Sequence, residues 1–219
     1  MDRYEKYVVM DYVVNVFQSR SAFDTVFNEV LSWLESHGAG LLSVKRLDEQ
    51  TRKLIEGDVP KELSGRSRSR YTNKIRLTLL PWMEKSRDQY KRARPGLLEK
   101  SIRIIADQFR LNDQEQVLFG MLVRYYSSKA VEDFWDEISR SILDVYCLLS
   151  TITGIDRKAV AKSLEQSGRL LVCGLVKPKN PIFSHSLKFE VPDSVMVALQ
   201  QGECDYRRMR SVVLGPSVS

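Results

Sequence analysis

The sequence lacks the motifs by which many catalytic sites are recognised. No GxxxxGK[ST], GxGxxG, HExxH or GxSxG pattern occurs in its 219 residues. This argues against a P-loop, a dinucleotide-binding fingerprint, a zinc-protease helix and a serine nucleophile elbow. Histidine is scarce, with His37 and His185 as the two examples, and neither has a Cys or Asp constellation near it in the sequence. We therefore expect no enzyme activity, no cofactor and no metal site in this chain.

Cysteine and long apolar runs are also scarce. The three cysteines, Cys147, Cys173 and Cys204, lie far apart and form no CxxC pair. An odd number at such spacing argues against a disulfide framework and a zinc site. No apolar run approaches the roughly 20 residues that cross a bilayer, and the first ten residues lack the charge pattern of a signal peptide. We expect a cytoplasmic protein in a reducing compartment.

What the sequence does contain is enough apolar material for a core. Hydrophobic residues make up 43% and charged residues 28% of the chain, as in ordinary globular domains. The net charge is +6 and the isoelectric point about 9.2. This balance permits nucleic-acid binding without establishing it.

The first half of the chain is expected to be a helical region over 1–94. Apolar spacing favours a helix over 3–18, although its β-branched residues keep a strand as the alternative. A stronger helical pattern covers 23–34, and a shorter one covers 48–56. Gly, Pro, Ser and Arg then dominate 57–74, which predicts an exposed or mobile basic loop.

The second half, 95–219, is expected to hold further helices and a small β element. One helix is opened by Pro95, one is capped by Asn112 or Asp113, and one leads into Gly154.

The text after Gly154 favours a winged helix. Asp156 can cap a short helix, and the apolar run over 170–176 has the length of a strand. A polar, proline-bearing connection over 178–185 leads to the alternating pattern of 187–191, which is typical of a half-buried strand. Pro192 suits the start of a closing helix. We therefore predict a fold that is mainly α with a small β-wing (α+β).

Two groups of cations are candidate contacts for nucleic acid or a partner. The first lies in the predicted loop, where Tyr71 is interleaved, and comprises Arg66, Arg68, Arg70, Lys74 and Arg76. Arginine and tyrosine together suit single-stranded nucleic acid through phosphate contacts and stacking. The alternative is an ordinary solvent-exposed loop.

The second group lies on and after the helix that follows Asp156, and comprises Arg157, Lys158, Lys162 and Arg169. In a winged helix that reads DNA, such side chains meet phosphates and base edges. Glu165 interrupts this face, and the first two cations oppose the helix dipole. A protein contact or a solvated face is therefore favoured over DNA reading.

The text from Phe109 to Leu214 resembles the region that precedes the ATPase core in a group of bacterial AAA+ ATPases. The resemblance begins with Leu111 to Glu115 and the following VLFGMLV. It continues through an "LL-x-x-G-L" pattern at Leu170, Leu171, Gly174 and Leu175, and a closing pattern at Phe189, Val195, Leu199 and Gly202. It covers roughly the second half of the chain. The tail ends without a cap or a packed element, as a fragment of a longer chain would.

This resemblance implies a non-catalytic N-terminal regulatory or partner-binding region of an AAA+ ATPase that acts through protein contacts. The implied partner is another protein or the remainder of the ATPase, and an oligomer would form through the ATPase core. No membrane partner is expected. The alternative is a DNA-binding winged-helix protein, such as a transcriptional regulator or a nucleic-acid defence component.

Overall fold

A computed structural model describes residues 1–41, 65–142, 144–179 and 187–202 of the chain. These residues fold mainly into α-helices, with one two-stranded antiparallel sheet. The predicted fold class, mainly α with a small β component, is confirmed.

The chain divides into two compact units that are each built from two stretches of sequence. The first unit contains Met1–Arg94 and Asp133–Leu143, and the second contains Pro95–Glu132 and Asp144–Ser219. The chain therefore leaves the first unit after Arg94, returns to it for eleven residues, and ends in the second.

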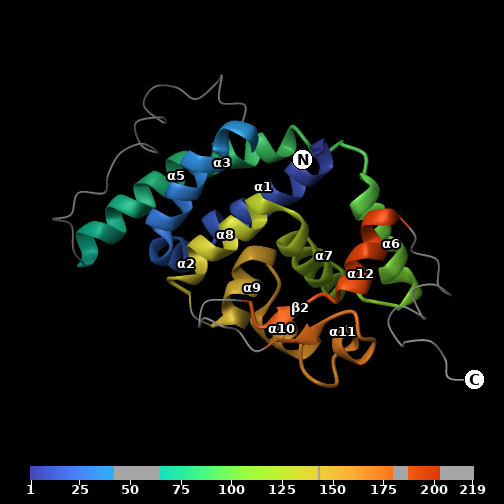
Figure 1. Ribbon diagram of the computed structural model, residues 1–219. Helices are drawn as coiled ribbons and strands as arrows, with labels where there is room; N and C mark the ends of the chain where they lie inside the picture. Colours follow the sequence, from blue (N-terminus) through green and yellow to red (C-terminus); the bar gives the residue numbers. More distant parts are fainter. Residues whose placement is uncertain (42–64, 143, 180–186, 203–219) are drawn as a thin grey trace, which may run out of the picture. The chain divides into compact units, whose positions relative to one another are not determined.

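The first unit is a helical assembly around one long helix. Its elements are α1 (Arg3–Gln18), α2 (Arg20–Thr25), α3 (Phe27–Leu41), α5 (Gly65–Asp88) and the part of α8 (Lys129–Ser139) that begins at Asp133. Figure 1 shows α1 running beside α5, and α2 contacts both of these helices. Residues 3–18 are thus a helix, and the strand alternative is wrong.

Local chemistry fixes the start of α1, and aromatic packing fills the core beside it. The Asp2 carboxylate accepts a hydrogen bond from the Glu5 amide at 2.8 Å, which satisfies one free donor of the first turn. The rings of Phe17, Phe23 and Phe27 follow one another at centroid distances of 4.5 and 5.4 Å. All three rings are fully buried, so they join α1, α2 and α3 through the hydrophobic effect.

The predicted basic loop over 57–74 is wrong for residues 65–74, which form the first turns of α5. Arginine and serine alternate over 66–70, so these residues show no apolar repeat of helical period. The repeat becomes visible at the buried positions Thr72, Ile75 and Leu79. Asp24 of α2 accepts hydrogen bonds from the hydroxyls of Ser69 and Thr72, so a tertiary contact holds this segment in place. Residues 57–64 and the expected helix over 48–56 lie outside the described residues.

The second unit is organised around α7. Its elements are α6 (Leu97–Gln108), α7 (Asp113–Ser127), α9 (Val145–Thr153), α10 (Arg157–Ser163), α11 (Arg169–Val172), β1 (Lys177–Pro178), β2 (Phe189–Glu190) and α12 (Asp193–Gln201). Helix α7 contacts α6, α9, α10 and α11, and α12 packs on α6.

Capping residues set the ends of these helices where the sequence predicted them. Asn112 and Glu115 form a capping box at the start of α7, each side chain accepting from the other's amide at 2.9 Å. Gly154 ends α9 with a φ of +72°, a conformation that glycine adopts without a Cβ penalty. Asp156 accepts from the amides of Lys158 and Ala159, as predicted for the cap of α10.

The strand predicted over 170–176 is wrong. The segment begins as the short helix α11 and continues into a turn, and strand pairing starts at Lys177. Leu170 and Leu175 are fully buried, whereas Val172 is 67% exposed. A short apolar run does not distinguish a buried strand from a buried helical turn, which explains the error.

The small sheet pairs β1 with β2 in an antiparallel register that places Lys177 opposite Glu190. Leu187 and Phe189 are buried while Lys188 is exposed. This is the alternation that the sequence predicted for the second strand.

None of the helices in the described parts of the chain is both long enough and apolar enough to cross a membrane.

Candidate functional site

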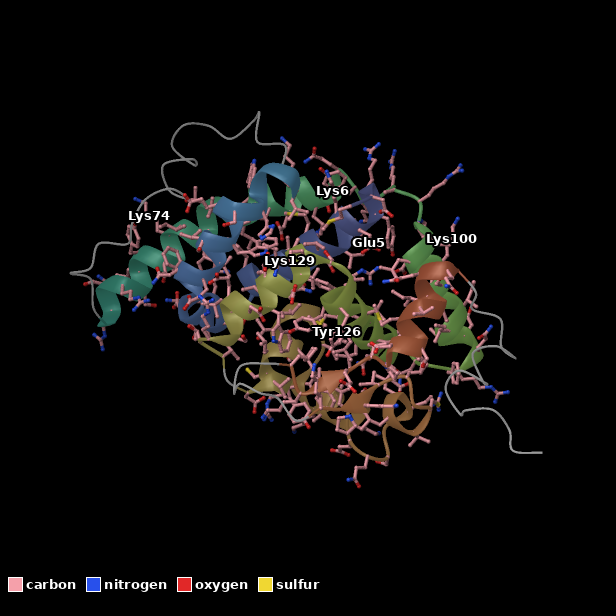
Figure 2. All side chains as sticks on the ribbon, in the orientation of Figure 1. Glu5, Lys6, Lys74, Lys100, Tyr126 and Lys129 are labelled. Atoms are coloured by element: carbon pink, nitrogen blue, oxygen red, sulfur yellow. The ribbon has the colours of Figure 1, made fainter. Side chains whose placement is uncertain are left out.

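The first group of candidate cations lies on α5 and does not form a single cluster. Arg66, Arg68, Arg70 and Lys74 are all exposed, and Lys74 can be located on this helix in Figure 2. Because an α-helix turns by about 100° per residue, Arg66, Arg70 and Lys74 share one face and Arg68 lies on nearly the opposite side. The helix therefore brings three of these four cations into line.

Arg76 has a different role from the other cations of α5. Its guanidinium donates to the carbonyl oxygen of Phe17 at 2.9 Å and to the side chain of Asn73 at 3.3 and 3.2 Å. The carbonyl belongs to the last turn of α1, so Arg76 joins α5 to α1. We therefore remove it from the set of free contact residues.

The second group is also split by intramolecular contacts. Arg157, at the start of α10, donates to Asp144 at 2.8 Å, and Asp144 also caps α9 by accepting from the Cys147 amide at 2.7 Å. These two hydrogen bonds, that of Arg157 first, lower the pKa of the Asp144 carboxyl below its ordinary value. Arg157 thus connects α9 to α10 within the unit.

Arg169 is likewise engaged inside the second unit. Its guanidinium donates to the backbone carbonyl of Arg110, in the turn between α6 and α7. Arg110 has a φ of +52°, in the left-handed region. Arg169 therefore joins α11 to a strained turn, which is a structural task.

Lys158 and Lys162 keep exposed side chains on α10. They lie one helical turn apart and so share a face. Glu165 follows them and is exposed as well. Structural contacts within the second unit explain Arg157 and Arg169. They do not explain the two lysines, which therefore remain the candidate contact residues of the second group.

A pocket of about 550 Å³ opens beside the small sheet and was not anticipated from the sequence. It lies between the end of α7, the two strands and α12. Its lining residues are Tyr126, Lys177, Lys179, Glu190, Val191, Pro192, Asp193, Ser194, Met196 and Gln200. In the sequence, the pair of lysines at Lys177 and Lys179, on either side of Pro178, is the signal that could have indicated this pocket.

Tyr126 forms one wall of this pocket, and Figure 2 labels it near the end of α7. Its hydroxyl donates to the Phe189 carbonyl at 2.8 Å, and the Lys179 ammonium lies 5.9 Å from the ring centre. Burial, with smaller contributions from Tyr125 and Glu190, raises the pKa of Tyr126 above its ordinary value. A tyrosine held protonated in a hydrogen bond to the backbone acts as a structural donor rather than a base.

The charges around the pocket are mixed. Lys177 and Glu190 face each other across the strands, and Asp193 and Ser194 occupy the first turn of α12. The pocket therefore presents charges of both signs beside the hydroxyl of Ser194.

Of the two histidines, His37 lies in the described parts of the chain. His37 contacts Asp133 at 3.1 Å and stacks on Trp33 with a centroid distance of 5.3 Å, both within the first unit. His185 lies outside the described residues. No group of three or more metal-ligating side chains occurs among the residues whose positions are described.

Comparison of the chain with protein-family models, with curated proteins and with solved structures found no match.

Proposed function

We propose that this chain is a non-catalytic, partner-binding region of an AAA+ ATPase, and that its second unit is a winged helix acting through protein contacts. The order α9, α10, α11, β1, β2 and α12 supports the winged-helix part. The resemblance of residues 109–214 to the region before an AAA+ core supports the proposed assignment to that family.

The ion pair between Arg157 and Asp144 is the main observation that favours binding of a protein over reading of DNA. In a DNA-reading winged helix, cations on the helix that enters the groove must be free to meet phosphates. The Arg157 guanidinium forms an ion pair with Asp144 at 2.8 Å, and the Arg169 guanidinium donates a hydrogen bond to the Arg110 carbonyl. Two of the four cations of this group therefore make contacts within the second unit rather than being available to phosphates.

Exposed apolar side chains in the second unit support the same proposal. Leu97 and Ile104 of α6 are 58% and 44% exposed, and Val197 of α12 is 48% exposed. Leu97 and Ile104 are seven residues apart and share a face of α6. Single exposed apolar residues are common, but two on one helical face offer area to a protein partner.

A binding experiment tests the choice of protein contacts. A generic DNA duplex is titrated with the chain across a salt series, and we expect no steep salt dependence. DNA binding through several phosphates would lower the logarithm of the affinity by about 0.9 per contact for each tenfold rise in salt. A slope of that kind would contradict the proposal.

The family assignment has its own test. The gene that encodes the chain is read beyond the Ser219 codon, and we expect a GxxxxGK[ST] motif there. The chain itself should not hydrolyse ATP, because backbone amides and a lysine of that motif would have to cradle the phosphates. A stop codon after Ser219, or turnover by the purified chain, would contradict the assignment.

DNA binding is the second candidate function, and four exposed lysines of the second unit favour it. Lys158 and Lys162 on α10 and Lys177 and Lys179 around β1 are all exposed, on the elements that a winged helix presents to DNA. If this candidate is correct, the variant Lys158→Gln/Lys162→Gln reduces the salt slope by about two. Lys91→Gln/Arg92→Gln, with the same change in charge in the first unit, should leave the slope unchanged.

A further inference from the structure

Helix α5 carries a face that combines cations with exposed apolar groups. Arg66, Arg70, Lys74, Leu77 and Pro81 are all exposed and recur at intervals of three or four residues. They therefore lie within a sector of roughly 80° along one side of the helix. We call these five residues the α5 stripe.

The opposite side of α5 is the one that packs. Thr72, Ile75, Leu79 and Met83 are at most 2% exposed. Asp24 contacts Ser69 and Thr72, so this carboxylate lies toward the packed side and does not neutralise the α5 stripe. Arg66 and Arg70 are exposed on the other side of the helix.

The charge on this side has a single sign over a long stretch. No Asp or Glu occurs from Gly65 to Met83, whereas five cations do. Acidic residues return at Glu84 and Asp88, where Glu84 accepts from Gln18 and Asp88 pairs with Arg87. The α5 stripe is therefore a bounded basic surface about 22 Å long, at 1.5 Å per residue.

Two features of the α5 stripe favour a protein over a nucleic acid as its ligand. Leu77 is 55% exposed in line with the cations, and a phosphate backbone gains nothing from covering it. Pro81 is exposed one helical turn further on and adds a second apolar side chain to this end of the stripe. An amphipathic helix with acidic residues at one end and apolar residues at the other would match both the charges and the apolar end.

We propose that the α5 stripe is the docking surface for an acidic, amphipathic helix of a partner protein, of about four turns. Carboxylates spaced one turn apart on that helix pair with Arg66, Arg70 and Lys74, and an apolar side chain covers Leu77 beside Pro81. This inference rests on the proposed function, because it names the class of protein partner.

The test uses synthetic probes and the whole chain. The first probe is a helical peptide with three glutamates at four-residue spacing followed by two leucines, and the second replaces both leucines with serine. A single-stranded DNA and a duplex are the other probes, and binding is followed by fluorescence anisotropy at low and at near-physiological salt. We expect the first peptide to bind about fivefold more tightly than the second, because partial burial of a leucine is worth that factor.

Matched variants locate the binding. Leu77→Ser should weaken the first peptide about fivefold and leave its salt dependence unchanged. Arg66→Gln/Arg70→Gln/Lys74→Gln should abolish most of the salt dependence. Lys91→Gln/Arg92→Gln/Arg94→Gln removes the same charge from exposed positions just after α5 and should change neither quantity.

Three results would overturn the inference. Tighter binding of DNA than of either peptide, lost in the α5 triple variant, would make the stripe a nucleic-acid contact. An equal loss in both triple variants would show attraction by net charge without a site. No binding of any probe at low salt would make the stripe solvated surface. The reading of the gene beyond Ser219 is independent of these outcomes, so failure of the family assignment is recognised separately.

Discussion

Arg124 and Glu99 bring opposite charges together inside the second unit. Their side chains are 3% and 8% exposed, and Arg124 donates to Glu99 at 2.7 Å. Glu99 also accepts from Arg103 at 2.8 Å, and Arg124 donates to the Gly120 carbonyl at 3.2 Å. A buried pair of this kind adds little over an apolar pair, but removal of Arg124 leaves the buried Glu99 carboxylate paired with Arg103, a half-exposed side chain.

We therefore expect Arg124→Met to lower the free energy of unfolding by about 3–5 kcal/mol. The matched control is Arg103→Met, because Arg103 pairs with the same carboxylate while its side chain is 49% exposed. That exposed pair should contribute at most about 1 kcal/mol. Urea unfolding of both variants provides the measurement, and equal losses would show that burial does not set the cost.

A second prediction at the residue scale concerns the acid side of the stability curve. Because its pKa is lowered in the folded chain, Asp144 stabilises the fold above its unfolded pKa and loses that contribution as the pH falls through the folded value. Arg157→Gln should raise the pKa of Asp144 toward its ordinary value, although the Cys147 amide still holds part of the shift. NMR titration of the carboxyl carbon measures this, and an unchanged pKa would show that the ion pair does not form in solution.

At the scale of elements, α7 shows how one glycine can serve a neighbouring side chain. A Cβ added at Gly120 would lie 2.8 Å from the guanidinium nitrogen of Arg124, and 3.8 Å from Ile102 of α6. Gly120 therefore makes room for the buried ion pair. Gly40 in α3 has no atom within 4 Å of such a Cβ among the described surroundings.

This contrast predicts opposite signs for the same substitution in two helices. Gly40→Ala should raise the free energy of unfolding by up to about 1 kcal/mol, because alanine is the better helix former. Gly120→Ala should lower it by about 1–3 kcal/mol, because the new methyl group displaces a buried guanidinium. Thermal unfolding of the two variants tests this, and stabilisation by Gly120→Ala would mean that Arg124 has space to move.

At the scale of the whole molecule, the question is whether the two units unfold together. Leu175 is fully buried in the second unit, and three residues earlier Val172 is 67% exposed. Both belong to the apolar run that the sequence presents as one core segment. An aspartate in place of Leu175 must be buried without a partner, whereas an aspartate in place of Val172 reaches water.

Leu175→Asp should therefore cost several kcal/mol, enough to unfold the second unit of a marginally stable protein. Val172→Asp should change stability by less than about 0.5 kcal/mol. Hydrogen exchange should show loss of protection in α7 and α12 for Leu175→Asp, with α1 and α5 still protected. Loss of protection in α1 and α5 as well would mean that the chain folds as one cooperative body.

The sequence by itself determined that the chain is mainly helical and located the caps at Asn112 and Asp156. Asn112 and Asp156 act locally, because a side-chain oxygen reaches an amide two or three residues away in any context. The alternation of Leu187, Lys188 and Phe189 similarly decided which side of β2 is buried, since strand geometry has a period of two.

Tertiary structure decided where α5 begins, which residues of 170–176 are buried, and which cations are free. Residues 65–74 become helical where Asp24 of α2 meets Ser69 and Thr72, contacts that span more than forty residues of sequence. The segment 170–176 folds as a helical turn because packing, rather than its apolar composition, selects among short elements. Arg157 and Arg169 read in the sequence as surface cations, yet their partners, Asp144 and the Arg110 carbonyl, are brought to them by the packing of helices. Local periodicity carries no information about such pairings, because they depend on distances between elements that only the folded chain fixes.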